Sequence, residues 1–256
     1  MGDAKRLIVK PIAAADARRI IRTLHYSGKV DPRSRVHLGV FLDGRCGGAI
    51  QFGPSIQKSR IIGLVRDTPW NGFLELNRLA FADWLPRNGE SRAIGYAMRW
   101  LKKTYPWLQW VVSFADGTQC GDGTIYRASG FVLTAIKKNS SLWRVPSGEV
   151  VCDLVTRMPG SAGVKARIGF HLGETWGQYA RRVGADRLTG FQLRYVYFLD
   201  PTTRARLTVP VLPFSEIDKR GAGMYRGQPR DRSRENAAPL PSGEGAVMLP
   251  GRSTND

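Results

Sequence analysis

Apolar and polar positions in the first part of the chain change their spacing repeatedly, from the period of a strand to that of a helix. Residues 6–10 alternate as a strand does. Apolar residues within 17–24 recur at intervals of three and four, which predicts a helix that stops near Gly28. Residues 36–42 and 46–53 are strand-like runs separated by an Asp-Gly pair, which is typical of a tight hairpin turn. The pattern predicts a strand, a helix and a hairpin.

The middle of the chain predicts a second group of elements around two apolar strands. Residues 73–81 alternate as a strand, and residues 91–103 carry an apolar stripe with helical spacing, for which Ser91 is a candidate N-cap. A further apolar strand follows at residues 110–116. Because strand–helix–strand units of this length are right-handed and parallel by default, we expect the two strands to run parallel in one sheet.

The last part of the chain predicts shorter elements and then loses its pattern. Strands are expected at residues 131–136, 150–156 and 192–199, with a helix over 175–183. From about residue 226 the chain is rich in Pro, Gly, Ser and Arg without apolar periodicity, which predicts disorder. Truncation after Gly223 should therefore leave the folded core unchanged.

The order of these elements predicts an α/β protein with a mixed sheet and helices on both of its faces. We expect one folded domain over residues 1–218, with a C-terminal extension from about residue 157. A basic, disordered tail is expected at residues 219–256.

The charge of the chain points to a polyanionic partner. The formal net charge is +18, of which residues 219–256 contribute +3 and residues 1–218 contribute +15. A folded domain this basic gains free energy when it neutralises phosphates and releases their counterions. The alternatives are a merely solvated basic surface or an anionic membrane surface, but no long amphipathic basic helix is evident. Double-stranded DNA is the expected partner.

Apolar runs and cysteines limit the setting in which the protein works. No apolar run approaches the roughly 18 residues that a membrane span requires, and the N-terminus lacks the apolar segment of a signal peptide. The three cysteines are odd in number and include no Cys-x-x-Cys pair. The sequence predicts a protein of the reducing cytoplasm with no membrane partner and no structural zinc site.

One strand end offers a candidate for acid–base chemistry. The strand at residues 110–116 ends in Asp116 and Gly117, and a short predicted helix that carries Tyr126 follows. Ligands of open α/β sheets bind beyond the carboxyl ends of the strands, so Asp116 is a candidate catalytic carboxylate. The alternative is that Asp116 only forms a turn. His25, on the last turn of the first helix, is a second candidate base or a residue that caps that turn.

Four short segments carry a resemblance to a known family. They are His-Tyr-Ser-Gly at 25–28, Glu-Leu-Asn-Arg-Leu-Ala at 75–80, Ser-Phe-Ala-Asp at 113–116 and Ile-Tyr-Arg-Ala-Ser-Gly-Phe at 125–131. The element order resembles the GNAT acyltransferase fold, and the segments together resemble the Mom family of bacteriophage DNA-modification proteins over roughly residues 7–215. The resemblance implies a transferase that converts DNA adenine to N6-(carbamoylmethyl)adenine in the host cytoplasm and protects phage DNA from restriction.

The resemblance also implies which residues act. They are His25, Tyr26, Arg78, Ser91, Asp116 and Tyr126. Adenine N6 is a poor nucleophile, so Asp116 could accept its proton while Tyr126 protonates the leaving group. Arg78 could pair with a phosphate of the donor or of DNA. The alternatives are a salt bridge from Arg78 to Glu75 or Glu90 and ordinary packing for Tyr126. A metal held by His25 and Asp116 has weak support, because two ligands do not make a site.

A cofactor follows from the same resemblance. GNAT proteins hold the pyrophosphate of an acyl-CoA at a helix N-terminus, which implies acetyl-CoA, or another activated acyl donor, bound by Ser91, Arg92 and Gly95. In the register that places the helix correctly, Gly95 is the one residue of the usual GNAT signature that this chain keeps. A literal match at residues 92–97 would lie inside the helix.

The substrate must reach this chemistry, and a base inside a duplex cannot, so we expect a flipped-out adenine. Six basic residues in loops are expected to contact the DNA backbone: Lys29, Arg33, Arg35, Lys58, Arg60 and Arg66. The runner-up function is an ordinary GNAT N-acetyltransferase that acts on protein or small-molecule amines. A third reading, a non-catalytic basic DNA-binding module, leaves the clustered Asp116, Tyr126, Arg78 and His25 unexplained.

Overall fold

A seven-stranded mixed sheet forms the body of the protein. We describe it in a computed structural model, which defines residues 3–157, 161–225 and 227–230. The spatial order of the strands is β1-β2-β3-β4-β5-β10-β6. Their bounds are β1 Ile8–Pro11, β2 Val36–Leu42, β3 Arg45–Gly53, β4 Phe73–Phe81, β5 Trp110–Gly117, β6 Val132–Asn139 and β10 Gly190–Phe198. Strands β4 and β5 pair in parallel, as expected, and the other neighbours pair antiparallel.

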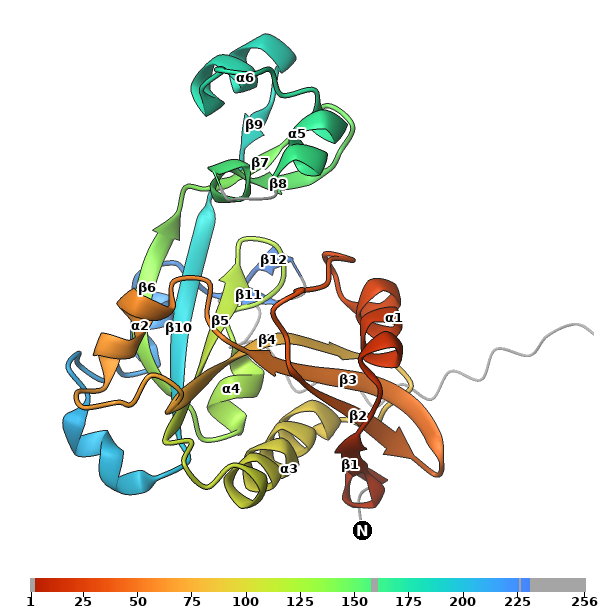
Figure 1. The fold of residues 1–256 in the computed structure, drawn as a ribbon, viewed down its shortest axis with the longest axis vertical. Helices are drawn as coiled ribbons and strands as arrows, with labels where there is room; N and C mark the ends of the chain where they lie inside the picture. The colour runs from red at the N-terminus through yellow and green to blue at the C-terminus, as the bar shows by residue number, and fades with distance from the viewer. Residues whose placement is uncertain (1–2, 158–160, 226, 231–256) are drawn as a thin grey trace, which may run out of the picture.

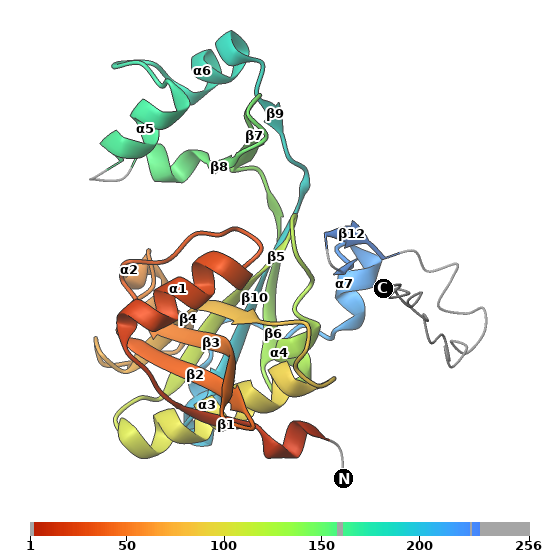
Figure 2. The same ribbon diagram turned by 90° about the vertical axis from the view of Figure 1, so that its right-hand side faces the viewer.

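Helices cover both faces of the sheet, because successive strand residues point to opposite sides (Figures 1 and 2). On one face Ala49 of β3 packs with helix α1, Ala14–Leu24. On the other face Ile50 packs in the main core with helix α3, Gly89–Thr104. The expected mixed α/β sheet with helices on both faces is confirmed. Short helices complete the body: η1 Asp3–Arg6, α2 Lys58–Ile61, η2 Ile62–Leu64 and α4 Thr124–Ala128.

Strands β4 and β5 separate halfway along their length. They pair only over Phe73–Glu75 and Trp110–Val112, after which β4 continues to Phe81 and β5 to Gly117 without a shared ladder. A register shift between β3 and β4 leaves Asn77 without a partner residue on β3. Such bulges bend a strand. The two strands therefore open a wedge on the side of the sheet where Asp116 lies.

A separate unit stands beyond the ends of β6 and β10, at residues 140–189 (Figures 1 and 2). We call these residues the insert. It contains a three-stranded sheet and two helices: β7 Leu142–Arg144, β8 Val150–Cys152, η3 Asp153–Arg157, α5 Ala162–Ile168, α6 Trp176–Val183 and β9 Asp186–Arg187. Its own core is built around Trp176 and Tyr179.

The insert corrects two sequence expectations. The chain after residue 157 is not a C-terminal extension, because β10 returns to the main sheet and pairs between β5 and β6. The strand expected over residues 150–156 ends at Cys152 and continues as a 3-10 turn. A run with apolar residues two or three apart suits either conformation when it is this short.

The segment after β10 is folded further than expected. It forms η4 Pro201–Arg206, α7 Ser215–Lys219, β11 Met224–Tyr225 and β12 Gln228–Pro229. The tail expected from residue 219 therefore begins later, since residues 220–225 and 227–230 are described and include β11 and β12. Residues 231–256, the rest of the expected tail, lie outside the described residues. Within the described part of the chain, no helix is both long and apolar enough to span a bilayer.

Candidate active site

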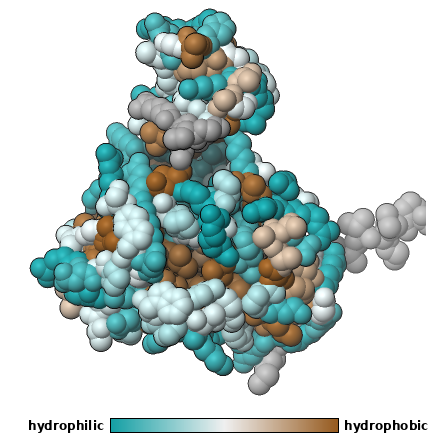
Figure 3. Space-filling view, viewed as in Figure 1, coloured by the Kyte–Doolittle hydropathy of each residue, from teal (hydrophilic) through white to brown (hydrophobic). Residues whose placement is uncertain are grey.

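A cavity of about 1150 Å³ lies where β4 and β5 separate, beneath the insert. Figure 3 shows this recess with apolar surface inside it. Its walls come from four parts of the chain that are distant in sequence. They are the loop at residues 24–30, the second half of β4 at 76–81, the end of β5 with the loop at 119–126, and the insert. Met224 and Tyr225 close a further side.

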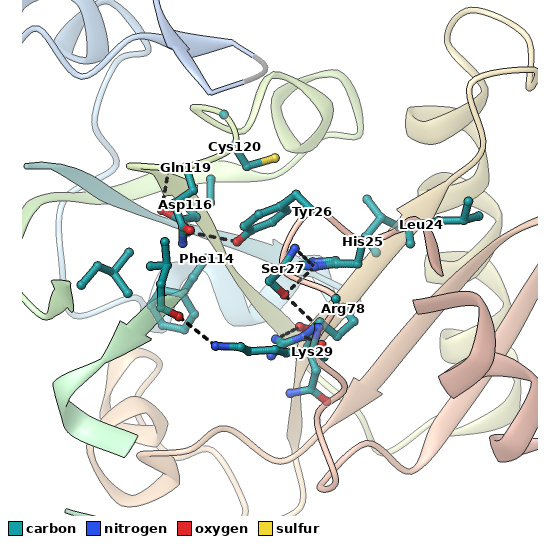
Figure 4. Close-up of a pocket in the computed structure, with 18 of the residues that line it drawn as sticks. Leu24, His25, Tyr26, Ser27, Lys29, Arg78, Phe114, Asp116, Gln119 and Cys120 are labelled. Atoms are coloured by element: carbon teal, nitrogen blue, oxygen red, sulfur yellow. Dashed lines mark hydrogen bonds between the residues drawn. The ribbon is translucent and has the colours of Figure 1, made fainter. Parts of the chain in front are cut away.

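Asp116 lies in this cavity with its carboxylate held by four donors. Oδ1 accepts the backbone N–H groups of Thr118 at 2.9 Å and Gln119 at 3.2 Å. Oδ2 accepts the side-chain amide of Gln119 at 2.9 Å and the hydroxyl of Tyr26 at 3.0 Å (Figure 4). Asp116 does form the turn that the alternative reading expected, and the same turn fixes the orientation of the carboxylate in the cavity.

His25 and Tyr26 reach the cavity from the end of α1. The ring centroids of the two side chains are 4.4 Å apart, and Tyr26 is half-exposed. Burial, together with the charge of Arg78, lowers the pKa of His25 to about 4. The backbone N–H of Ser27 donates to His25 Nδ1 at 3.2 Å, so the proton of the neutral ring lies on Nε2. His25 is thus neutral at physiological pH, and its Nδ1 atom is already engaged.

This lowered pKa predicts an acid-sensitive fold. Unfolded His25 takes up a proton near pH 6.5 and folded His25 only near pH 4, so its contribution to stability is lost as the pH falls from about 6.5 to about 4. The loss should be at most about 3.4 kcal/mol. Denaturant unfolding at several pH values should show a weaker acid dependence for H25Q than for the wild type. The control is H171Q, at an exposed histidine of the insert; equal acid dependence in H25Q and the wild type would contradict the prediction.

Arg78 binds backbone rather than a carboxylate. Its Nε atom donates to the carbonyl of Lys29 at 2.8 Å, and Nη1 donates to the carbonyl of Asn77 at 2.6 Å (Figure 4). The alternative expectation was a salt bridge from Arg78 to Glu75 or Glu90. The hydrogen bonds of Arg78 described here go to backbone carbonyls instead. Arg78 therefore fastens the loop that carries His25 and Tyr26 to the bulged part of β4.

Tyr126, on α4, forms part of the cavity floor. It is buried between the rings of Phe131 and Tyr195, whose centroids lie 5.4 and 5.3 Å from its own. Burial raises the pKa of Tyr126 to about 12. Its hydroxyl is therefore protonated at neutral pH and can serve as a proton donor. Tyr126 packs over the sheet, as the alternative expected, and it also lines the cavity, while its role as a proton donor stays a prediction.

The residues expected to bind the cofactor lie outside the cavity wall. Helix α3 begins at Gly89 after Asn88, which has a left-handed φ of 65°, so Ser91 is inside the first turn and is not the N-cap. Its hydroxyl donates to the carbonyl of Asn88. Arg92 packs against Tyr96 of the same helix. A Cβ atom added at Gly95 would have ordinary space. The residue of this turn that lines the cavity is Glu90.

The basic residues expected at the mouth of the site are only partly there. Lys29 lines the cavity, whereas Arg33, Arg35, Lys58, Arg60 and Arg66 lie outside its wall. Arg33 forms a two-pronged ion pair with buried Asp31. Two cations that sequence reasoning missed, Arg22 and Arg167, do line the cavity.

Other missed residues come from segments whose meeting depends on the tertiary fold. Gln119, which holds Asp116, could have been suspected because it lies two residues after the Asp-Gly pair. Glu149 and Tyr225 carry no signal of this kind in the sequence. Cys120 lines the cavity as well, and burial, with the nearby carboxylates, raises the pKa of its thiol. No group of three His, Cys, Asp or Glu side chains suited to a metal ion occurs in the described residues.

A split mixed sheet with an oriented carboxylate, a neutral histidine and a protonated tyrosine at the opening defines an α/β protein with a candidate acid–base site. The chain belongs to the Mom protein family, which matches residues 6–216. One relative is the methylcarbamoylase Mom of Escherichia phage Mu, 42% identical over 220 residues, which cover 84% of this chain and 85% of the relative.

Solved acetyltransferases are similar at a much lower level. A spermidine/spermine N-acetyltransferase from Vibrio cholerae in complex with manganese ions has a TM-score of 0.42 and 10% identity, over 79% of this chain and 98% of the other. A Bacillus subtilis acetyltransferase in complex with CoA has a TM-score of 0.39 and 10% identity, over 75% and 97%.

Proposed function

We propose that this protein is a transferase that converts adenine in double-stranded DNA to N6-(carbamoylmethyl)adenine, and that it thereby protects phage DNA from restriction in the bacterial cytoplasm. The observation that carries the proposal is the carboxylate of Asp116, fixed by four hydrogen bonds within a cavity next to Tyr26 and Tyr126. Family membership and the 42% identity to the phage Mu methylcarbamoylase support the choice of substrate.

The reaction forms one bond and breaks another. The N6 atom of adenine attacks the methylene carbon of an activated carbamoylmethyl donor, while the bond from that carbon to its leaving group breaks. The N6 proton passes to Asp116, and the leaving group takes a proton from Tyr126. Water then returns the proton from Asp116 to the phenolate, so the enzyme is restored.

Asp116 is better suited than His25 to act as the base. In neutral His25 the Nδ1 atom accepts from Ser27 and the Nε2 atom carries the proton, so neither nitrogen has a free lone pair for N6–H. Asp116 has two oxygens and about four lone-pair sites. Tyr26 donates to one of these sites from a half-exposed position and can give it up to an incoming amine. We assign His25 and Arg78 to holding the loop of Tyr26.

We do not name coenzyme A as the donor, because the residues expected to hold its pyrophosphate at the start of α3 do not face the cavity. Ser91, Arg92 and Gly95 are outside the cavity wall, and Glu90 is the residue of this turn that lines it. We therefore propose the second class of donor that the sequence implies, an activated acyl donor other than acetyl-CoA. Other groups of the cavity hold this donor.

The cavity leaves room for a base in addition to the donor. Its volume of about 1150 Å³ exceeds the usual range for one small ligand, roughly 300 to 1000 Å³. The half-exposed ring of Tyr26 at this opening can stack on a flipped adenine. A base stacked on this ring would lie next to Asp116, which accepts from the hydroxyl of Tyr26.

Mass analysis of nucleosides from the DNA of cells that express the protein tests the proposal. We expect a modified deoxyadenosine whose added group is carbamoylmethyl. An ordinary acetyltransferase acting on the same amine would add acetyl, which differs from carbamoylmethyl by the elements of one NH group and is resolved by mass. Unmodified DNA together with acetylated protein or polyamines would establish the acetyltransferase function instead.

A further inference from the structure

Two cations from different parts of the fold meet on one carboxylate at the cavity wall. Glu149, in the turn between β7 and β8 of the insert, accepts from Lys29 Nζ at 3.1 Å. It also accepts from Arg167 of α5, at 2.7 Å from Nη2 and 3.2 Å from Nε. All three residues line the cavity. This cluster connects the loop after Tyr26 with the insert.

The positions of the two cations are fixed by further contacts. The backbone carbonyl of Lys29 accepts from Arg78, and its backbone N–H donates to the hydroxyl of Ser27 (Figure 4). The Nζ atom of Lys29 also donates to the carbonyl of Val150 at 2.8 Å. Burial opposes the ionisation of Glu149, but hydrogen bonds and charges from Lys29 and Arg167 outweigh it and lower the pKa of this carboxyl.

We propose that Lys29 and Arg167 form a binding site for one backbone phosphate beside the target adenine, and that Glu149 occupies this site in the free protein. The inference rests on the proposed function, because it takes DNA as the substrate. A guanidinium that holds a carboxylate through Nε and Nη2 presents the same pair of donors to two phosphate oxygens. The lysine adds a second charge, since its Nζ atom approaches the same oxygen of Glu149 as Arg167 Nη2 does.

Exposure makes the exchange of carboxylate for phosphate feasible. The side chains of Lys29 and Arg167 are 48% and 55% exposed, and that of Glu149 is 26% exposed. Ion pairs exposed to this degree are weak because water screens them. A duplex phosphate that replaces Glu149 also releases condensed counterions, which favours the exchange at low salt.

The position of the site relative to Tyr26 supports a phosphate close to the reacting base. Lys29 follows Tyr26 by three residues, and an extended chain of that length spans at most about 10 Å. Lys29 and Tyr26 also line the same cavity, so a phosphate on Lys29 lies at the loop whose ring we expect to stack on the base. The insert then binds the backbone of the strand whose base enters the cavity.

The alternative is that Glu149 only ties the insert to the body of the protein. The two readings predict changes of opposite sign when the carboxylate is removed. If Glu149 occupies a phosphate site, E149Q frees two cations and should bind DNA more tightly. If Glu149 is a tether, E149Q loosens the insert and should bind DNA equally or more weakly.

The experiment measures binding of a labelled DNA duplex by the full chain at several salt concentrations. For E149Q we expect affinity higher on the order of fivefold at moderate salt. The slope of log affinity against log salt should steepen by up to about 0.9 for each freed cation. For R167Q we expect weaker binding and a slope that is shallower by up to about 0.9. The double variant E149Q/R167Q should lose most of the gain.

The chain offers a matched control outside the cavity. Glu216 of α7 lies between Lys219 and Arg220, at 3.2 Å from each, and its side chain is 22% exposed. E216Q and R220Q therefore change the same charges in the same kind of cluster, and they should leave both affinity and slope as in the wild type.

Two failures can be told apart. If the wild type modifies DNA but E149Q binds no more tightly and R167Q keeps the wild-type slope, the phosphate site is wrong and Glu149 is a tether. If the wild type neither binds nor modifies DNA, the proposed function fails and this inference fails with it. Should E149Q unfold, the slope of R167Q alone decides, because a tether would leave that slope unchanged.

Discussion

Replacement of Asp116 by asparagine should reduce DNA modification by a factor of about 10² to 10⁴, which is the usual contribution of a general base. The variant keeps the size of the side chain, and its Oδ1 atom can still accept from Thr118 and Gln119, so the turn should survive. What it loses is the ability to take a proton from N6. The measurement is the rate of modified nucleoside formation, together with DNA affinity and melting temperature, both of which should be nearly unchanged.

A matched control exists at Asp200. This residue forms the same type of turn, with Oδ1 accepting the backbone N–H of Thr202 at 3.0 Å, but it lies outside the cavity. D200N should modify DNA like the wild type. If D116N kept more than about a tenth of the activity, a barrier change below about 1.4 kcal/mol, Asp116 would not be the essential base.

Truncation after Gly223 should destabilise the protein by about 3 kcal/mol and greatly reduce its activity, contrary to the expectation from sequence. The removed segment includes Arg230, which pairs with Asp122 at 3.3 Å and donates to Thr124 at 2.7 Å. The side chain of Asp122 is only 1% exposed. The predicted loss is at the low end for a broken buried ion pair, because Arg127 still neutralises this carboxylate.

The same segment supports the loop that holds the candidate base. The backbone N–H of Gly227 donates to the carbonyl of Cys120 at 2.7 Å, and that of Asp122 donates to the carbonyl of Met224 at 3.0 Å. Its loss should therefore lower activity even where the chain remains folded. Unfolding curves and modification rates of chains that end at Gly223 and at Arg230 would measure both effects.

A chain that ends at Arg230 keeps every contact described here and serves as the first control. The second is a pair of point variants. R230M should reproduce much of the loss, whereas R220M, which breaks an exposed pair with Glu216, should cost no more than about 1 kcal/mol. A chain ending at Gly223 that melts like the one ending at Arg230 would contradict the packing of this segment.

The sequence predicts the body of the fold well where local patterns are strong. Strands β2 and β4 have the expected bounds, 36–42 from a strand-like apolar run and 73–81 from alternation. The helix after β4 begins before the expected Ser91, because its N-cap is Asn88, which has a left-handed backbone conformation and makes no side-chain cap hydrogen bond. In the insert, the helix expected over residues 175–183 is confirmed as α6, but the insert as a unit is not predicted, since strands of two or three residues carry too few positions to define a period.

The residues of the candidate site also fall into those that sequence patterns locate and those that they do not. Asp116, Tyr26, His25, Arg78 and Tyr126 all line one cavity, and each lies at a strand end, on a strand or at a helix end that sequence patterns locate. Their roles stay predictions. The residues that the sequence could not supply are those brought in by the insert and by the segment after β10. Their contact with the site depends on how whole units pack, which no local pattern encodes.

The place where the insert joins the sheet has a consequence for how such proteins can diversify. Asn139 of β6 and Gly190 of β10, the residues that flank the insert, are direct partners in an antiparallel ladder. A tight turn could join them without disturbing the strands beneath. The roof of the cavity is thus a replaceable module on an otherwise continuous hairpin. Evolution or design can exchange it, and with it the surface offered to the substrate, while the strands that carry the acid–base residues remain unchanged.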